Sequence, residues 1–184
     1  MKRSNIITFF LLILFTSVLF AQKEDAESYP GYVDFGNIAS FEKGNDVTEV
    51  NLDNKILKMV SKMTNEDDPE LAKMLSGMKM IHVNVFKIEK NDKDKLIDKI
   101  TKLDGNLTGK GWNRIVRSRE HGEYVNVYIK SDDNSIEGLV VTSLERNGEA
   151  AFVNIVGPID LELIGKLGKK FDIPSLDGIM KKGK

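Results

Sequence analysis

The sequence predicts an α+β domain, in which helices pack on one face of an antiparallel sheet of five to six strands that is mixed at one edge. Two observations predict this class. From residue 112 to residue 157, apolar and polar residues alternate through four successive runs separated by turn residues, which indicates a four-strand meander. Before residue 112, apolar residues recur every three or four positions behind helix-capping residues. The expected order of elements is therefore β-α-α-β-α-β-β-β-β-α.

The first strand and the first two helices are expected between residues 47 and 78. The run VTEVNL at 47–52 alternates as a strand does, and Asp53 behind it is a typical helix N-cap. Asp68 and Pro69 are the N-cap and first-turn pair that opens the second helix. Each helix carries one apolar stripe that we expect to be buried: Ile56, Met59, Val60 and Met63 in the first, and Leu71, Met74, Leu75 and Met78 in the second.

The other elements follow in chain order. The segment MIHVNVFKI at 80–88 is expected to be a strand, and a third helix begins after Asn91 or Asp92. A final helix is expected after Asp160, with Leu161, Ile164 and Leu167 buried. A tight Asn-Gly turn joins the last two strands of the meander. The four meander strands are expected at 112–119, 124–130, 136–145 and 150–157.

The beginning of the chain predicts export. Lys2 and Arg3 precede an apolar stretch at 6–20, and Ala21 supplies the small residue that signal peptidase needs. We therefore expect cleavage after Ala21 and a location in the periplasm or cell envelope. The alternative is an uncleaved membrane anchor, although about 15 apolar residues are short for a bilayer core that takes roughly 20. The expected division of the chain is a signal peptide at 1–21, a flexible lead-in at 22–46, one α+β domain at 47–170 and a loose tail at 171–184.

The composition argues against several classes of function. The chain has 27 basic and 28 acidic side chains, and removal of residues 1–21 leaves 25 and 28. This balance lacks the strongly basic face of a nucleic-acid-binding protein, so no nucleic-acid partner is expected. Cysteine is absent, so we expect neither a disulfide framework nor a lipid anchor on cysteine. No membrane-spanning segment is expected after cleavage.

Residues with catalytic or metal-binding potential are few, and none forms a known motif. His82 and His121 are far apart in the chain and have no cysteine to join them in a zinc site. The glycine-rich segment at 105–111 has the wrong spacing for a phosphate-binding loop, and it leaves a helix where such a loop would open one. The acidic segment at 131–137 lacks the glycine of an EF-hand calcium loop. We therefore expect no catalytic residue, no metal and no cofactor.

Two groups of residues are candidates for binding. Side chains alternate along the strand at 124–130, and one side carries tyrosines beside the arginines of the preceding strand. If this side is uncovered, it offers a protein-binding face; the alternative is a solvated sheet face with cross-strand packing. Methionines at helical spacing suit an adaptable apolar pocket between helices and sheet; the alternative is ordinary core packing. The candidate residues are Trp112, Arg114, Arg117, Tyr124 and Tyr128 for the face, and Met59, Met63, Met74 and Met78 for the pocket.

Three stretches of the sequence resemble a known family: LFAQ at 19–22, YVNVYIK at 124–130 and GPIDLELIGKL at 157–167. Over roughly residues 40–170, the chain is similar to the domain of unknown function 4252 family, exported bacterial proteins found mostly in Bacteroidetes. The resemblance implies export and a shared fold, and it carries over no catalytic residue.

The expected function is that of a non-catalytic periplasmic or cell-envelope protein that acts through protein partners. The absence of a recognisable reactive motif beside an export signal motivates this expectation. An alternative is a protein that binds a small apolar ligand in the methionine-lined pocket. A remote alternative is an unrecognised hydrolase, whose catalytic residues would be brought together from distant parts of the chain.

Overall fold

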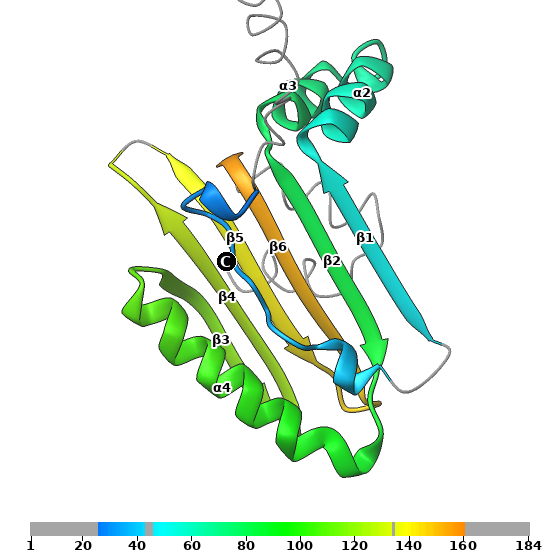
Figure 1. Cartoon of the computed structure of the whole chain (residues 1–184), viewed down its shortest axis with the longest axis vertical. Helices are drawn as coiled ribbons and strands as arrows, with labels where there is room; N and C mark the ends of the chain where they lie inside the picture. The colour runs from blue at the N-terminus through cyan, green and yellow to red at the C-terminus, as the bar shows by residue number, and fades with distance from the viewer. Residues whose placement is uncertain (1–25, 43–45, 134, 161–184) are drawn as a thin grey trace, which may run out of the picture.

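The computed structural model describes residues 26–42, 46–133 and 135–160 (Figure 1). Strands and helices follow the expected order as far as residue 160. The signal peptide, the final helix expected after Asp160 and the tail at 171–184 lie outside the described residues. Within the described ranges, no helix is long and apolar enough to cross a bilayer. The elements are β1 (Val47–Asp53), α2 (Asn54–Thr64), α3 (Pro69–Gly77), β2 (Met80–Lys87), α4 (Lys93–Gly109), β3 (Asn113–Glu120), β4 (Glu123–Ser131), β5 (Ile136–Leu144) and β6 (Glu149–Ile159), with short 3-10 turns η1 (Ala26–Ser28), η2 (Ala39–Phe41) and η3 (Lys90–Asp92).

The strands form one six-stranded sheet in the order β1-β2-β6-β5-β4-β3, and every neighbouring pair is antiparallel. The α+β class and the four-strand meander are therefore confirmed, whereas the expected mixed edge is corrected. The α2–α3 hairpin is the reason for the correction. Because it returns the chain to the end of the sheet where β1 stopped, β2 runs opposite to β1 (Figure 1).

The helices of the α2–α3 hairpin begin where the sequence predicts. The Asp53 carboxylate accepts a hydrogen bond from the Ile56 amide at 2.9 Å, and Asp68 accepts one from the Leu71 amide at 3.0 Å. Pro69 stands in the first turn of α3, where its missing N–H group leaves no hydrogen bond unmade. These caps are contacts between residues three apart, so the local sequence is enough to predict them.

The exposed side of α2 is not the predicted one. Met59 and Met63 are 65% and 79% exposed, and Ile56 is exposed as well. The apolar stripe of α3 does enter the core, as predicted: Leu71, Met74, Leu75 and Met78 are all buried. In α2, the buried residues are Asn54, Leu57 and Ser61.

Two buried hydrogen bonds explain why α2 turns this side inward. The Asn54 side-chain amide donates to the Met78 carbonyl at 2.9 Å. The Ser61 hydroxyl donates to the Ala72 carbonyl at 2.6 Å. Because both acceptors lie on or just after α3, the small polar side chains of α2 face α3. Ile56, Met59 and Met63 of the predicted stripe then face outward, whereas Val60 is half-buried against the core.

Apolar side chains line both faces of the sheet. On one face lie α4 and the N-terminal strap, which we define as residues 29–42 (Figure 1). The opposite face carries a second cluster, which includes side chains of α2 and α3. Successive residues of a strand belong alternately to the two clusters, as Val140 and Val141 do. The sequence predicted that the helices share one face of the sheet. Instead, α4 belongs to one cluster, and α2 and α3 belong to the other.

A polar network joins α4 to the meander. The Arg114 guanidinium on β3 donates to both carboxylate oxygens of Asp104 on α4, at 2.5 and 2.6 Å. The Tyr128 hydroxyl on β4 donates to Asp104 Oδ1 at 2.9 Å. Burial and, after it, the hydrogen bond to Asp104 raise the pKa of Tyr128 to about 12. The hydrogen bond to Asp104 also raises the pKa of Arg114.

Stability at alkaline pH is expected to depend on Tyr128. Its pKa in the folded chain, about 12, is above the ordinary value of 10.0, so folding stabilises the neutral phenol. This contribution is fully present below about pH 10 and is lost as the pH rises toward about 12, because the unfolded chain loses the proton first. In a series of urea unfolding curves, we expect the free energy of unfolding to fall by about 2 kcal/mol across this window.

The matched control is Tyr128→Phe, which keeps the ring and removes the titrating group. The difference between wild type and variant separates Tyr128 from the other tyrosines and the lysines that titrate in the same window. If the two proteins lose stability in parallel above about pH 10, the pKa of Tyr128 is not raised by folding.

Candidate functional site

Asn154, fully buried at the centre of β6, fastens the N-terminal strap to the sheet. Its side-chain oxygen accepts a hydrogen bond from the Val33 amide at 2.9 Å. Its amide group donates to the carbonyls of Gly31 and Leu139, at 2.9 and 3.2 Å. The strap, the part of the expected lead-in that the structure describes at 29–42, is hydrogen-bonded to the sheet and packed on it. Its buried side chains are Val33, Phe35 and Ile38.

The strap crosses β5 at a point where two glycines meet. A Cβ atom added to Gly138 would lie 2.5 Å from the Cα atom of Gly31 and 2.7 Å from the Trp112 ring. Because real Cβ atoms do not approach other atoms so closely, a side chain at Gly138 would push the strap away. The two glycines thus set the height of the strap above the sheet.

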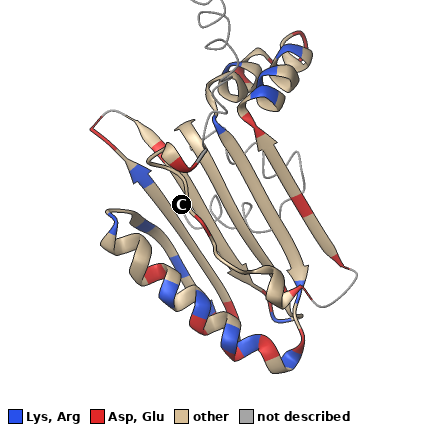
Figure 2. Ribbon diagram, in the orientation of Figure 1, with Lys and Arg blue, Asp and Glu red and all other residues tan. Residues whose placement is uncertain are grey.

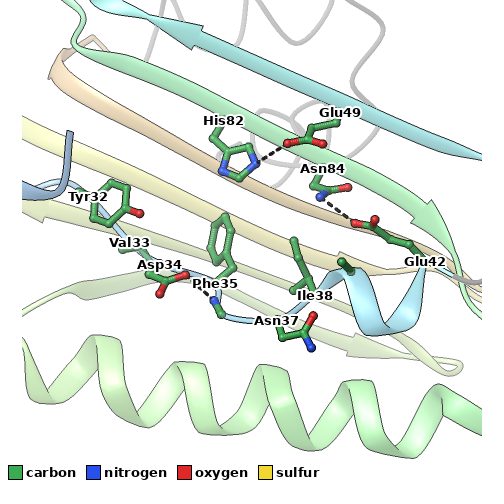
Figure 3. Close-up of a pocket in the computed structure, with 12 residues that line it drawn as sticks. Tyr32, Val33, Asp34, Phe35, Asn37, Ile38, Glu42, Glu49, His82 and Asn84 are labelled. Carbon is green, nitrogen blue, oxygen red and sulfur yellow. Dashed lines mark hydrogen bonds and ion pairs between the residues drawn. The ribbon is translucent and has the colours of Figure 1, made fainter. Parts of the chain in front are cut away.

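Beyond this crossing, the strap and the first two strands enclose an open cleft of about 290 Å³ (Figure 3). The strap, which includes η2, forms one wall, and β1 and β2 form the floor. This volume is at the lower end of the range for ligand sites, so the cleft suits one side chain or one small molecule. Its polar and aromatic lining includes Asp34, Phe35, Glu42, Glu49, His82 and Asn84.

Strand pairing explains why polar side chains from β1 and β2 meet in the cleft. Glu49 of β1 is the register partner of Asn84 on β2, and His82 lies two residues earlier on β2. Residues two apart on a strand, and cross-strand partners, point to the same face of a sheet. Glu49, His82 and Asn84 therefore face the strap together (Figure 3).

Asn84 is the most buried polar side chain of the cleft, at 5% exposed. Its amide nitrogen donates a hydrogen bond to Glu42 Oε1 at 2.9 Å. This contact fixes the orientation of the amide, because only the NH₂ group can donate to a carboxylate. Asn84 Oδ1 is left buried, with no hydrogen-bond partner in the described part of the chain.

His82 is the second cleft residue with an unused hydrogen-bonding atom. Its Nε2 atom is buried and lacks a hydrogen-bond partner among residues 26–42, 46–133 and 135–160. Glu49 Oε1 lies 3.8 Å from Nε2, which is an ion-pair distance but too long for a hydrogen bond (Figure 3). The ring of Phe35 stands 6.2 Å from the imidazole, centroid to centroid. The cleft thus holds two buried polar atoms that a ligand could satisfy.

The charge of the cleft is one-sided. Charged residues are concentrated on the helices and on β3, while β2, β5 and β6 carry few (Figure 2). The residues that line the cleft nevertheless include three carboxylates, those of Asp34, Glu42 and Glu49, and no lysine or arginine. Asp34 accepts a hydrogen bond from the Gly36 amide at 2.7 Å, which ties it to the turn of the strap. The lining therefore presents acceptors and negative charge.

The five residues predicted to form a partner-binding face are not presented as one surface. Trp112 and Tyr128 are buried in the cluster beneath α4 and the strap. Arg114 pairs with Asp104 of α4, and half-buried Tyr124 lies 5.6 Å from the Arg119 guanidinium. Only Arg117 is exposed. The expectation assumed that this side of the meander is uncovered, whereas α4 packs on it.

The four methionines predicted to line a pocket are also separated. Met59 and Met63 are at the surface on the outer side of α2, whereas Met74 and Met78 are in the core. A cavity lined by all four is therefore absent from the described structure. The cause is the inward turn of the Asn54 and Ser61 side of α2.

Sequence reasoning missed the cleft, although one signal was present. In the strand MIHVNVFK, His82 and Asn84 stand between Met80 and Phe86 on the side of the strand that enters a core. Polar residues on an apolar face need partners, so their place in the alternation marks the region. The other wall, from the strap, has no comparable signal because its contacts span more than a hundred residues.

The comparisons with known proteins place the chain in a family. No curated protein and no solved structure matches it significantly. One family does match, described as Domain of unknown function (DUF4252), over residues 41–167. The matched range includes all six strands and the cleft residues Glu42, Glu49, His82 and Asn84. Since it spans more than half of the sequence, the chain belongs to this family of domains of unknown function.

Proposed function

We propose that this chain is an exported, non-catalytic binding protein of the bacterial cell envelope, which holds a segment of a partner protein in the cleft. The observation that carries the proposal is the pair of buried, unpartnered polar atoms in the lining, Asn84 Oδ1 and His82 Nε2. Buried polar atoms are almost always hydrogen-bonded, and each one left unpaired costs about 1–3 kcal/mol. A ligand that pairs with them would recover this free energy on binding.

The chemistry of the lining favours binding over catalysis. None of the residues that line the cleft is serine, threonine, cysteine or lysine, so the lining lacks the aliphatic hydroxyl, thiol and amine nucleophiles of covalent catalysis. His82 and Glu49 resemble the base and its orienting carboxylate in a catalytic triad, but the lining holds no serine, threonine or cysteine as the third member. We therefore assign the two residues to ligand recognition.

The proposed location follows from the first residues of the sequence. The basic, apolar and small-residue parts of residues 1–21 support export and cleavage after Ala21. The near balance of acidic and basic side chains supports a protein partner over a nucleic acid. The partner is accordingly sought in the periplasm or cell envelope.

Native mass spectrometry of the protein isolated from its own envelope tests the proposal. We expect a chain that begins at Gln22 and retains a partner polypeptide, seen as an added mass. Ala39→Trp, at an exposed position of η2 that lines the cleft, is expected to fill the opening and to abolish the added mass. Met59→Trp on the outer side of α2 is the matched control, and should retain the partner.

Two outcomes contradict the proposal. An added mass that survives Ala39→Trp but not Met59→Trp would move the binding site to α2. If the chain carries no partner in any envelope fraction, the proposed binding function is wrong.

A further inference from the structure

We propose that the cleft recognises a guanidinium group, as carried by an arginine side chain of the partner. This inference rests on the proposed function and makes it specific, since it names the chemistry of the group that enters. Three features of the lining carry it: the direction of its unused hydrogen bonds, its charge and its aromatic ring.

Around Asn84, the hydrogen-bonding groups that remain available are acceptors, namely its own Oδ1 and the carboxylates of Glu42 and Glu49. The NH₂ group of Asn84 already donates to Glu42, whereas its Oδ1 acceptor, on a side chain 5% exposed, has no partner in the described part of the chain. The carboxylates of Glu42 and Glu49 also only accept, and each has more lone pairs than its contact with Asn84 or His82 uses. A ligand that satisfies this set must bring several N–H donors.

The charge of the lining selects a cation among such donors. Asp34, Glu42 and Glu49 bring three carboxylates to one cleft, and no lysine or arginine lines it. Carboxylates that line one cleft attract a cation into it. A neutral donor such as an amide lacks this attraction.

The shape of the site favours guanidinium over ammonium. The acceptors come from different elements, with Glu42 on the strap, Glu49 on β1 and Asn84 on β2, and Asn84 lies between the two carboxylates (Figure 3). A planar guanidinium has five N–H donors in a fixed fork, whereas an ammonium is a compact point charge. Phe35, 6% exposed and packed against His82 and Phe152, adds an aromatic ring to the lining.

A titration of the isotope-labelled full chain, followed by NMR, tests the inference with three probes. N-acetylarginine methylamide carries the guanidinium, N-acetylcitrulline methylamide is its neutral isostere, and N-acetyllysine methylamide with a free side-chain amine carries an ammonium. We expect the arginine probe to bind about tenfold or more tightly than the citrulline probe, and more tightly than the lysine probe. The signals that shift should be those of His82, Asn84 and the strap.

Two isosteric substitutions locate the site. Glu42→Gln and Glu49→Gln each remove one negative charge and keep an acceptor oxygen, and each is expected to weaken the arginine probe by about tenfold. Glu66→Gln in the exposed turn after α2 makes the same charge change outside the cleft and should leave binding unchanged. Glu49 is 60% exposed, so Glu49→Gln tests the inference even if Glu42→Gln disturbs the strap.

The outcomes separate this inference from the proposed function. Equal binding of the arginine and citrulline probes overturns the cationic ligand, and so does binding that survives both glutamine variants. If no probe binds while the envelope-derived chain loses its partner on Ala39→Trp, the guanidinium assignment is wrong and the proposed binding role stands. Tighter binding of the lysine probe replaces guanidinium with ammonium.

Discussion

Asn154→Ala is expected to lower the free energy of unfolding by about 3–5 kcal/mol, one of the two largest effects we predict for a single side chain. The side chain is 0% exposed and holds the strap through the Val33 amide and the Gly31 carbonyl. Alanine would leave both backbone groups buried without a partner, each at a cost of about 1–3 kcal/mol, and would leave a small cavity as well. Urea unfolding of both proteins measures the difference.

Asn113→Ala is the matched control for Asn154→Ala, because Asn113 is exposed at the start of β3. We expect it to change the free energy of unfolding by no more than about 0.5 kcal/mol. Hydrogen exchange adds a local readout, since the Val33 amide should lose its protection in the Asn154→Ala protein. A variant as stable as wild type, with the Val33 amide still protected, would show that Asn154 does not hold the strap.

Gly138→Ala is expected to displace the strap and to cost about 2–3 kcal/mol. The added methyl group would lie 2.5 Å from Gly31 Cα and 2.7 Å from the Trp112 ring, and the first of these neighbours is backbone that cannot rotate away. The strap would then rise from the sheet, and the wall of the cleft would move with it. We expect a lower urea midpoint and faster proteolytic cleavage within residues 29–42.

Gly105→Ala is the matched control for this second substitution. Gly105 lies within α4 and has no neighbour within 4 Å of an added Cβ atom. Alanine at a helix-interior glycine stabilises by about 0.5–1 kcal/mol, so the same chemical change should have the opposite sign here. If Gly138→Ala is neutral or stabilising, the close crossing of the strap over β5 is wrong.

Local signals in the sequence predicted much of the fold. The caps at Asp53 and Asp68 depend on residues three positions away, and the meander depends on alternation and tight turns. Such signals fail where a distant contact overrides them. The stripe of Ile56, Met59, Val60 and Met63 predicted a buried face of α2. Val60 is half-buried against the core, but the hydrogen bonds from Asn54 and Ser61 to α3 leave the other three exposed.

The binding surfaces were harder to predict, because they depend on which face of the sheet each segment covers. Tyr124 and Tyr128 alternate correctly along β4, yet the alternation does not say that α4 and the strap will cover that side. The cleft is assembled from residues 32–42, Glu49 and the pair His82 and Asn84, which no sequence spacing connects. Its clearest signal was polar residues in the apolar alternation of β2.

The central claim is that the protein binds its partner between the strap and the first two strands. Hydrogen–deuterium exchange tests it most directly, when the protein in its native envelope fraction is compared with the same protein after purification. We predict slower exchange in the envelope for residues 32–42 and for the amides around Glu49 and Asn84. Unchanged exchange at these residues, with new protection on the outer side of α2, would contradict the claim and assign binding to the exposed methionines Met59 and Met63.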